Sequence, residues 1–70
     1  MQVDVIDDEI IVTLPGTRYT VTYYKPATSG LLAKNISMED DNRSEMSLSN
    51  FLARAWRLAN NKAREIGWIV

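Results

Sequence analysis

Hydrophobic residues recur every three or four positions along the last third of the chain, over residues 47–66. At about 100° per residue, one side of a helix collects Leu48, Phe51, Leu52, Ala55, Trp56, Leu58, Ala59, Ala63 and Ile66. This spacing predicts one amphipathic helix about 30 Å long. Ser47 is expected to cap the start of this helix, and Gly67 is expected to end it.

The first half of the chain alternates with a period of two, which is typical of strands with one buried face. Residues 9–14 and 17–25 are separated by Pro15-Gly16, a pair that favours a tight turn. The residues expected to face the core are Ile10, Val12, Leu14, Tyr19, Val21 and Tyr23. The two segments are therefore predicted to form an antiparallel hairpin.

Two further segments carry weaker strand patterns. Residues 31–36 predict a third strand, although Lys34 and Asn35 interrupt its alternation. Residues 2–6 could form a fourth strand, but the sequence does not decide this, since Asp4 weakens an otherwise apolar run. Residues 37–46 are mostly polar and acidic and are expected to be an exposed loop.

These elements predict one α+β domain over residues 1–70, a two-layer β-β-β-α unit. Its antiparallel meander sheet has three strands, or four if residues 2–6 pair, and the long C-terminal helix covers one face. The strands span about 17–23 Å, less than the length of the helix. Part of the apolar stripe is therefore expected to overhang the sheet, where the tail, residues 67–70, or a second copy of the chain could cover it.

The residue types present exclude several kinds of chemistry. The chain has no cysteine and no histidine, so disulfides, triad catalysis and the usual ligands of zinc are absent. The run Asp7-Asp8-Glu9 lacks the glycine and the terminal glutamate of a calcium loop, and is read as a solvated turn. A chain of 70 residues seldom builds a deep cleft. We therefore expect no enzymatic activity, no cofactor and no metal.

Charge and hydropathy restrict the partners and the cellular compartment that we expect. The net charge is −1, which gives no overall attraction to nucleic acid or to a membrane. No charge-free apolar run approaches the length of a membrane span, and no signal peptide opens the chain. The cytoplasm is therefore the expected compartment.

The overhanging half of the helix is the candidate interaction surface, formed by Trp56, Lys62, Trp68 and Ile69. Lys62 interrupts the apolar side of the helix. Its stem is expected to lie along the sheet while its ammonium group reaches water, and the alternative is a cation at a ligand site or a subunit seam. We expect a small binding protein that acts through self-association, as a homodimer, or through a protein partner.

The opposite side of the helix offers a second candidate surface, formed by Arg54, Arg57, Asn61 and Arg64. Clustered guanidinium groups can bind phosphates, Asn can read a base edge, and an exposed Tyr24 could add stacking. An ordinary solvated helix face is the competing interpretation, and it is favoured because the chain is not basic overall. A nucleic-acid-binding module is thus the alternative function.

The segments Leu14–Thr17, Phe51–Ala59 and Ala63–Trp68 (LPGT, FLARAWRLA and AREIGW) together carry a resemblance. In these segments the chain resembles a group of small uncharacterised bacterial proteins. The resemblance implies a bacterial, cytoplasmic protein and transfers no activity, ligand or catalytic residue.

Overall fold

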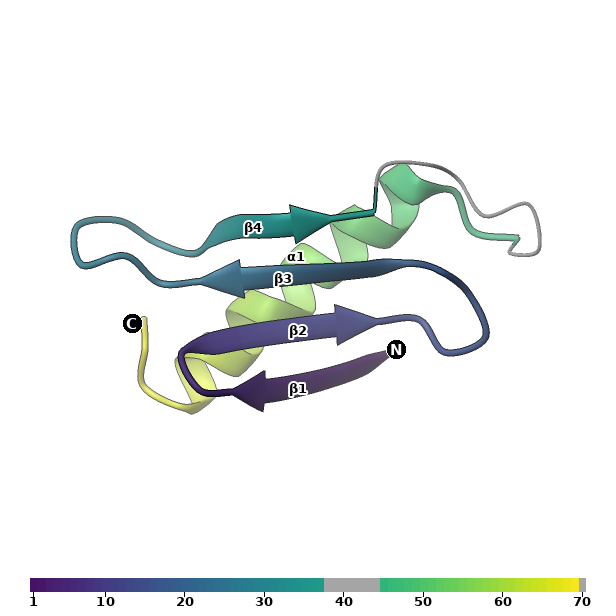
Figure 1. The fold of residues 1–70 in the computed structure, drawn as a ribbon. Helices are drawn as coiled ribbons and strands as arrows, with labels where there is room; N and C mark the ends of the chain where they lie inside the picture. The colour runs from purple at the N-terminus through teal and green to yellow at the C-terminus, as the bar shows by residue number, and fades with distance from the viewer. Residues whose placement is uncertain (38–44, 70) are drawn as a thin grey trace.

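The computed structural model describes residues 1–37 and 45–69, which form a four-stranded sheet and one helix. The strands are β1 (Gln2–Ile6), β2 (Glu9–Thr13), β3 (Thr20–Tyr24) and β4 (Leu32–Ile36), and the helix is α1 (Leu48–Glu65). All neighbouring strands are antiparallel, in the order β1-β2-β3-β4, and α1 runs diagonally across one face of the sheet (Figure 1). The predicted α+β meander is confirmed, with the N-terminal segment as its fourth strand. Most of the predicted acidic loop, residues 38–44, and Val70 of the tail lie outside the described residues.

Local hydrogen bonds set where the strands begin and end. Gly16 has a φ of 85° in the turn that follows β2, a conformation that glycine adopts without strain. The strand predicted from residue 17 begins only at Thr20. The Thr17 hydroxyl donates to the Leu14 carbonyl at 2.8 Å and accepts from the Tyr19 N–H at 3.1 Å, which holds residues 17–19 in the turn.

A β-bulge in β4 explains why its alternation is poor in the sequence. Ala33 pairs with Tyr23 and Asn35 pairs with Thr22, so Lys34 is the extra residue. Beyond the bulge, Ile36 pairs with Val21 and returns to the side of the sheet that α1 covers. The irregular pattern is therefore that of a bulged strand.

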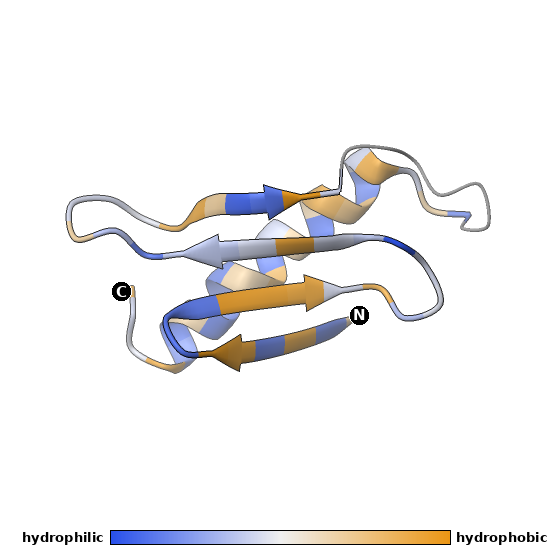
Figure 2. Ribbon diagram, viewed as in Figure 1, coloured by the Kyte–Doolittle hydropathy of each residue, from blue (hydrophilic) through white to orange (hydrophobic). Residues whose placement is uncertain are grey.

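The core lies between the sheet and α1. Figure 2 shows that β2 is the strand with the longest continuous hydrophobic run. Its buried apolar residues are Ile10, Val12, Tyr19, Val21, Tyr23, Leu31, Phe51, Ala55, Ala59 and Ala63. The ring of Phe51 stacks on that of Tyr19, with centroids 5.1 Å apart, and the Tyr19 hydroxyl donates to the Met46 carbonyl at 2.8 Å. Two residues predicted on the buried side of the helix are partly exposed, since Trp56 is 47% and Ile66 is 37% accessible. The buried stripe of α1 is thus narrower than the sequence predicted.

Both ends of α1 carry the predicted caps. The Ser47 hydroxyl accepts from the Asn50 N–H at 3.2 Å. At the other end Gly67 has a φ of 82°, and the Trp68 N–H donates to the Ala63 carbonyl at 2.8 Å. Trp68 and Ile69 turn back and pack against the core. The tail therefore covers the C-terminal end of the apolar stripe.

One strand of the sheet lies outside the cover of the helix. No Cα atom of α1 lies within 8 Å of one in β4, whereas α1 approaches β1, β2 and β3. All five residues of β4 are exposed, among them Leu32 and Ile36 at 45% and 40%. A helix is about 10–12 Å wide, and four strands span about 14 Å between their outer axes. One helix therefore does not cover this sheet.

Close packing of α1 depends on small side chains. Replacing Ala59, which has no exposed surface, with leucine should force the helix away from the sheet and lower the free energy of unfolding by about 1–3 kcal/mol. The matched control is Ala53→Leu on the exposed side of the helix, for which we expect a change within about 0.5 kcal/mol. Urea denaturation measures both variants, and equal effects would contradict the close approach of α1 to the sheet.

Candidate functional site

The outer side of α1 brings together the four residues of the second candidate surface. Arg54, Arg57, Asn61 and Arg64 are all exposed, and Arg64 Nη1 donates to Asn61 Oδ1 at 3.3 Å. Among the described residues, none of the three arginines forms a salt bridge. Their guanidinium groups are therefore available to an anionic ligand. We call Arg54, Arg57, Asn61 and Arg64 the arginine face.

An exposed tryptophan borders the arginine face. A surface hollow of about 300 Å³ is lined by Ala53, Trp56, Arg57, Asn60, Asn61 and Arg64. The Trp56 ring lies against Tyr23 of β3, with centroids 5.6 Å apart and planes tilted by 56°. Asn60 Nδ2 donates to the Trp56 carbonyl at 2.8 Å. The apolar spacing predicted Trp56 on the buried side of the helix, apart from the arginines, although residues 56, 60 and 64 have the spacing of neighbours on a helix.

The candidate interaction surface is distributed over two flanks of α1 and the tail. Trp56 and Lys62 lie roughly 120° apart around the helix axis, on either side of the buried alanines. Lys62 Nζ lies 3.5 Å from Glu65 Oε2 and is partly exposed, with 32% of the side chain accessible. Trp68 and Ile69 are half-buried against their own core. Trp56 therefore offers the most accessible aromatic surface of this group.

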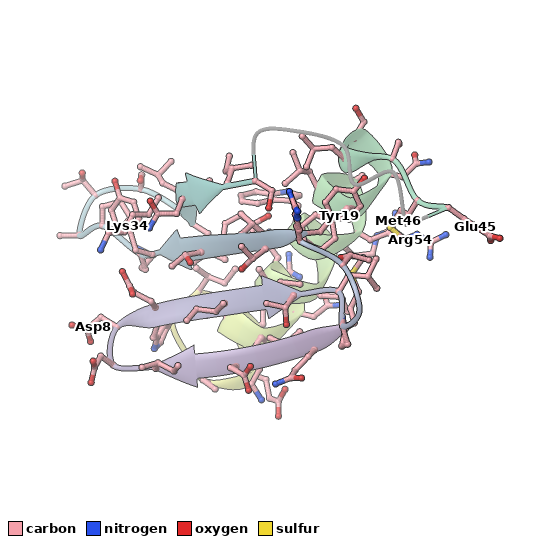
Figure 3. The ribbon with its side chains drawn as sticks, turned by 45° about the vertical axis from the view of Figure 1, so that its right-hand side comes forward. Asp8, Tyr19, Lys34, Glu45, Met46 and Arg54 are labelled. Carbon is pink, nitrogen blue, oxygen red and sulfur yellow. The ribbon has the colours of Figure 1, made fainter. Side chains whose placement is uncertain are left out.

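Each end of the domain carries both acidic and basic side chains. Figure 3 shows Asp8 and Lys34 at one end of the sheet and Arg54 at the other, near Glu45 and Met46. Tyr24 lies on β3 with its side chain on the open side of the sheet, away from α1, because its neighbours Tyr23 and Val21 face the core. Tyr24 is therefore not part of the arginine face.

The open side of the sheet carries a second hollow, of about 490 Å³, lined by Asp8, Glu9, Tyr24, Ala33 and Lys34. Lys34 Nζ reaches from β4 across β3 and lies 2.7 Å from Glu9 Oε2 on β2. The hydrogen bond that Lys34 donates to Glu9, followed by the charge of the Glu9 carboxylate, raises the pKa of Lys34. Lys34 and Glu9, two of the three charged residues that line this hollow, thus pair with each other.

Residues 1–37 and 45–69 contain no group of three or more acidic, cysteine or histidine side chains arranged to hold a metal ion. Within the same ranges, no helix combines the length and the apolar character that a membrane crossing requires.

Comparison with known proteins gives no match for this chain, whether to a protein-family model, to a curated protein or to a solved structure.

Alkaline pH should weaken the contacts on both sides of the sheet. Burial raises the pKa of Tyr23, so the folded state keeps its phenol protonated where the unfolded chain would ionise. The stability that this group contributes is complete below about pH 10 and is lost as the pH rises through the folded-state pKa. The stability contributed by the Lys34–Glu9 ion pair is also lost as the pH rises, because the pKa of Lys34 is raised as well.

We therefore expect the free energy of unfolding to fall as the pH rises above about 10, and to fall less in Tyr23→Phe. Urea denaturation at each pH measures this effect. The same pH dependence in Tyr23→Phe and in the parent chain would contradict the assigned role of Tyr23.

Proposed function

We propose that this chain is a small binding protein that acts through self-association, with Trp56 at the centre of the contact. The observation that carries the proposal is the incomplete cover of the sheet. The helix packs over three strands and leaves β4 exposed on the same side as Trp56.

The exposed apolar groups on this side adjoin buried residues of β3. Trp56 lies on Tyr23 of β3, Tyr23 pairs with Ala33 of β4, and Val21 pairs with the exposed Ile36. A domain of this size buries only about 60% of the surface of its unfolded chain, so covering more apolar area favours association. Aromatic side chains that remain accessible beside such a patch are the usual centres of protein contacts.

Removing the Trp56 side chain should weaken self-association. We expect a dimer in light scattering, and a dissociation constant raised by about tenfold or more in Trp56→Ala. The matched control is Ile6→Ala, which removes a similarly exposed apolar side chain, 54% accessible, from β1 at the opposite edge of the sheet. This control should leave the dissociation constant unchanged.

A monomer at high concentration would exclude self-association. An equal effect of both variants would exclude Trp56 as the centre of the contact. Thermal unfolding of each variant verifies that the fold is retained.

The second candidate function is binding of single-stranded nucleic acid by the arginine face. Arg54, Arg57 and Arg64 lack an ion pair among the described residues, and Trp56 borders the same hollow. Guanidinium groups beside an exposed ring are the combination that binds phosphates and stacks on bases. The net charge of −1 opposes this function, so we rank it second.

Arg57→Ala should weaken binding of a labelled single strand of about 20 nucleotides, and should reduce the slope of log K against log salt by about 0.7. The matched control is Lys62→Ala, which removes the same charge from the other flank of α1, where Lys62 is paired with Glu65. Fluorescence anisotropy at about 50–200 mM salt measures both variants. No binding of the parent chain at the lowest salt, or equal losses in both variants, would exclude the arginine face as a nucleic-acid site.

A further inference from the structure

β4 is an edge strand of the sheet, and among residues 1–37 and 45–69 no strand lies on the outer side of its backbone. Unpaired N–H and C=O groups along such an edge can pair with another strand. The strand carries one charged residue, Lys34, among Leu32, Ala33, Asn35 and Ile36. Its two faces present exposed apolar side chains, Leu32 on the open side and Ile36 on the side of α1.

A lysine and a bulge commonly protect an edge strand from pairing, and β4 has both. In this structure each is engaged within the domain. Lys34 extends inward over β3 to Glu9, at 2.7 Å, so its ammonium group is directed away from the edge and its charge is compensated. The bulge returns Ile36 to the side of α1, which increases the apolar surface next to the edge. Neither Lys34 nor the bulge therefore prevents another strand from pairing with β4.

The other edge strand, β1, is less suited to pairing with a copy of itself. Asp4 lies at its centre, and the acidic turn Asp7-Asp8 follows directly. Two β1 strands side by side would bring these carboxylates together, and like charges facing across strands are destabilising. In addition, α1 approaches β1 but not β4.

We propose that two copies of this chain pair through β4, antiparallel, to form one continuous sheet with both helices on the same face. This inference rests on the proposed self-association and specifies its geometry. The two-fold axis then stands perpendicular to the sheet between the β4 strands. The second helix lies beside the strip that α1 leaves open, and each Trp56 faces the axis with Tyr23 behind it. A second copy is the occupant because its β4 presents the same exposed apolar residues, Leu32 and Ile36, on the same two faces, so the paired strands bring like apolar groups together.

The absence of native cysteine permits a direct measurement. A spin label is attached to a single cysteine in Asn35→Cys, on β4, or in Asp4→Cys, on β1. Both positions lie on the open side of the sheet, where Asn35 is opposite Thr22 and Asp4 is opposite Ile11. Adjacent strands are about 4.8 Å apart, so the proposed dimer places the Asn35 labels under about 20 Å apart and the Asp4 labels about 34 Å apart.

Electron paramagnetic resonance measures both distances, at a concentration where light scattering shows a dimer. A short distance for the Asn35 labels with a long distance for the Asp4 labels supports pairing through β4. A dimer with the reverse order, or with both distances long, overturns this geometry and leaves self-association standing. A monomer overturns both proposals.

Discussion

The close contact between three buried alanines and the sheet is the constraint on which the rest of the structure depends. Ala55, Ala59 and Ala63 have no exposed surface and recur every fourth residue, so the backbone of α1 lies close to the strands. A row with this spacing is inclined to the helix axis, and α1 accordingly crosses the sheet diagonally (Figure 1). That direction determines which strands are covered, where Trp56 emerges and which side of the helix carries the arginines.

The sequence contains this architecture in its two periodicities, and it misses the features that depend on contacts between distant residues. Alternation identified the hairpin of β2 and β3, and the apolar spacing with Ser47 and Gly67 identified α1 and its ends. The fourth strand stayed open because Asp4 suggests a polar segment, whereas its partner Ile11 lies on the open side, where a carboxylate is hydrated. The bulge was hidden because only the pairing of Asn35 with Thr22 shows which residue is extra.

The two candidate surfaces were predictable to different degrees, because one depends on helical spacing alone and the other on contacts between distant residues. The arginine face follows from helical spacing alone, and the structure brings Arg54, Arg57, Asn61 and Arg64 to one side. The position of Trp56 depends on the width of the buried stripe. With alanine at its centre, the stripe is too narrow to enclose an indole ring on its flank, so Trp56 packs on Tyr23 and keeps an exposed surface. An overhang was expected at the end of the helix, where Trp68 and Ile69 now pack against the core, whereas the uncovered surface lies beside the helix over β4.

The two candidate functions share Trp56, and the geometry relates them to each other. In a dimer paired through β4, both helices lie on one face of the continuous sheet, so both arginine faces point in the same direction. The acidic turns after the β1 strands then lie at the two far edges. The arginine faces are thereby doubled on one face of the dimer, while the acidic turns lie away from it. A domain with a net charge of −1 has little attraction for a polyanion as a monomer. Paired in this way, it would present a locally basic surface, so any binding by the arginine face would depend on self-association.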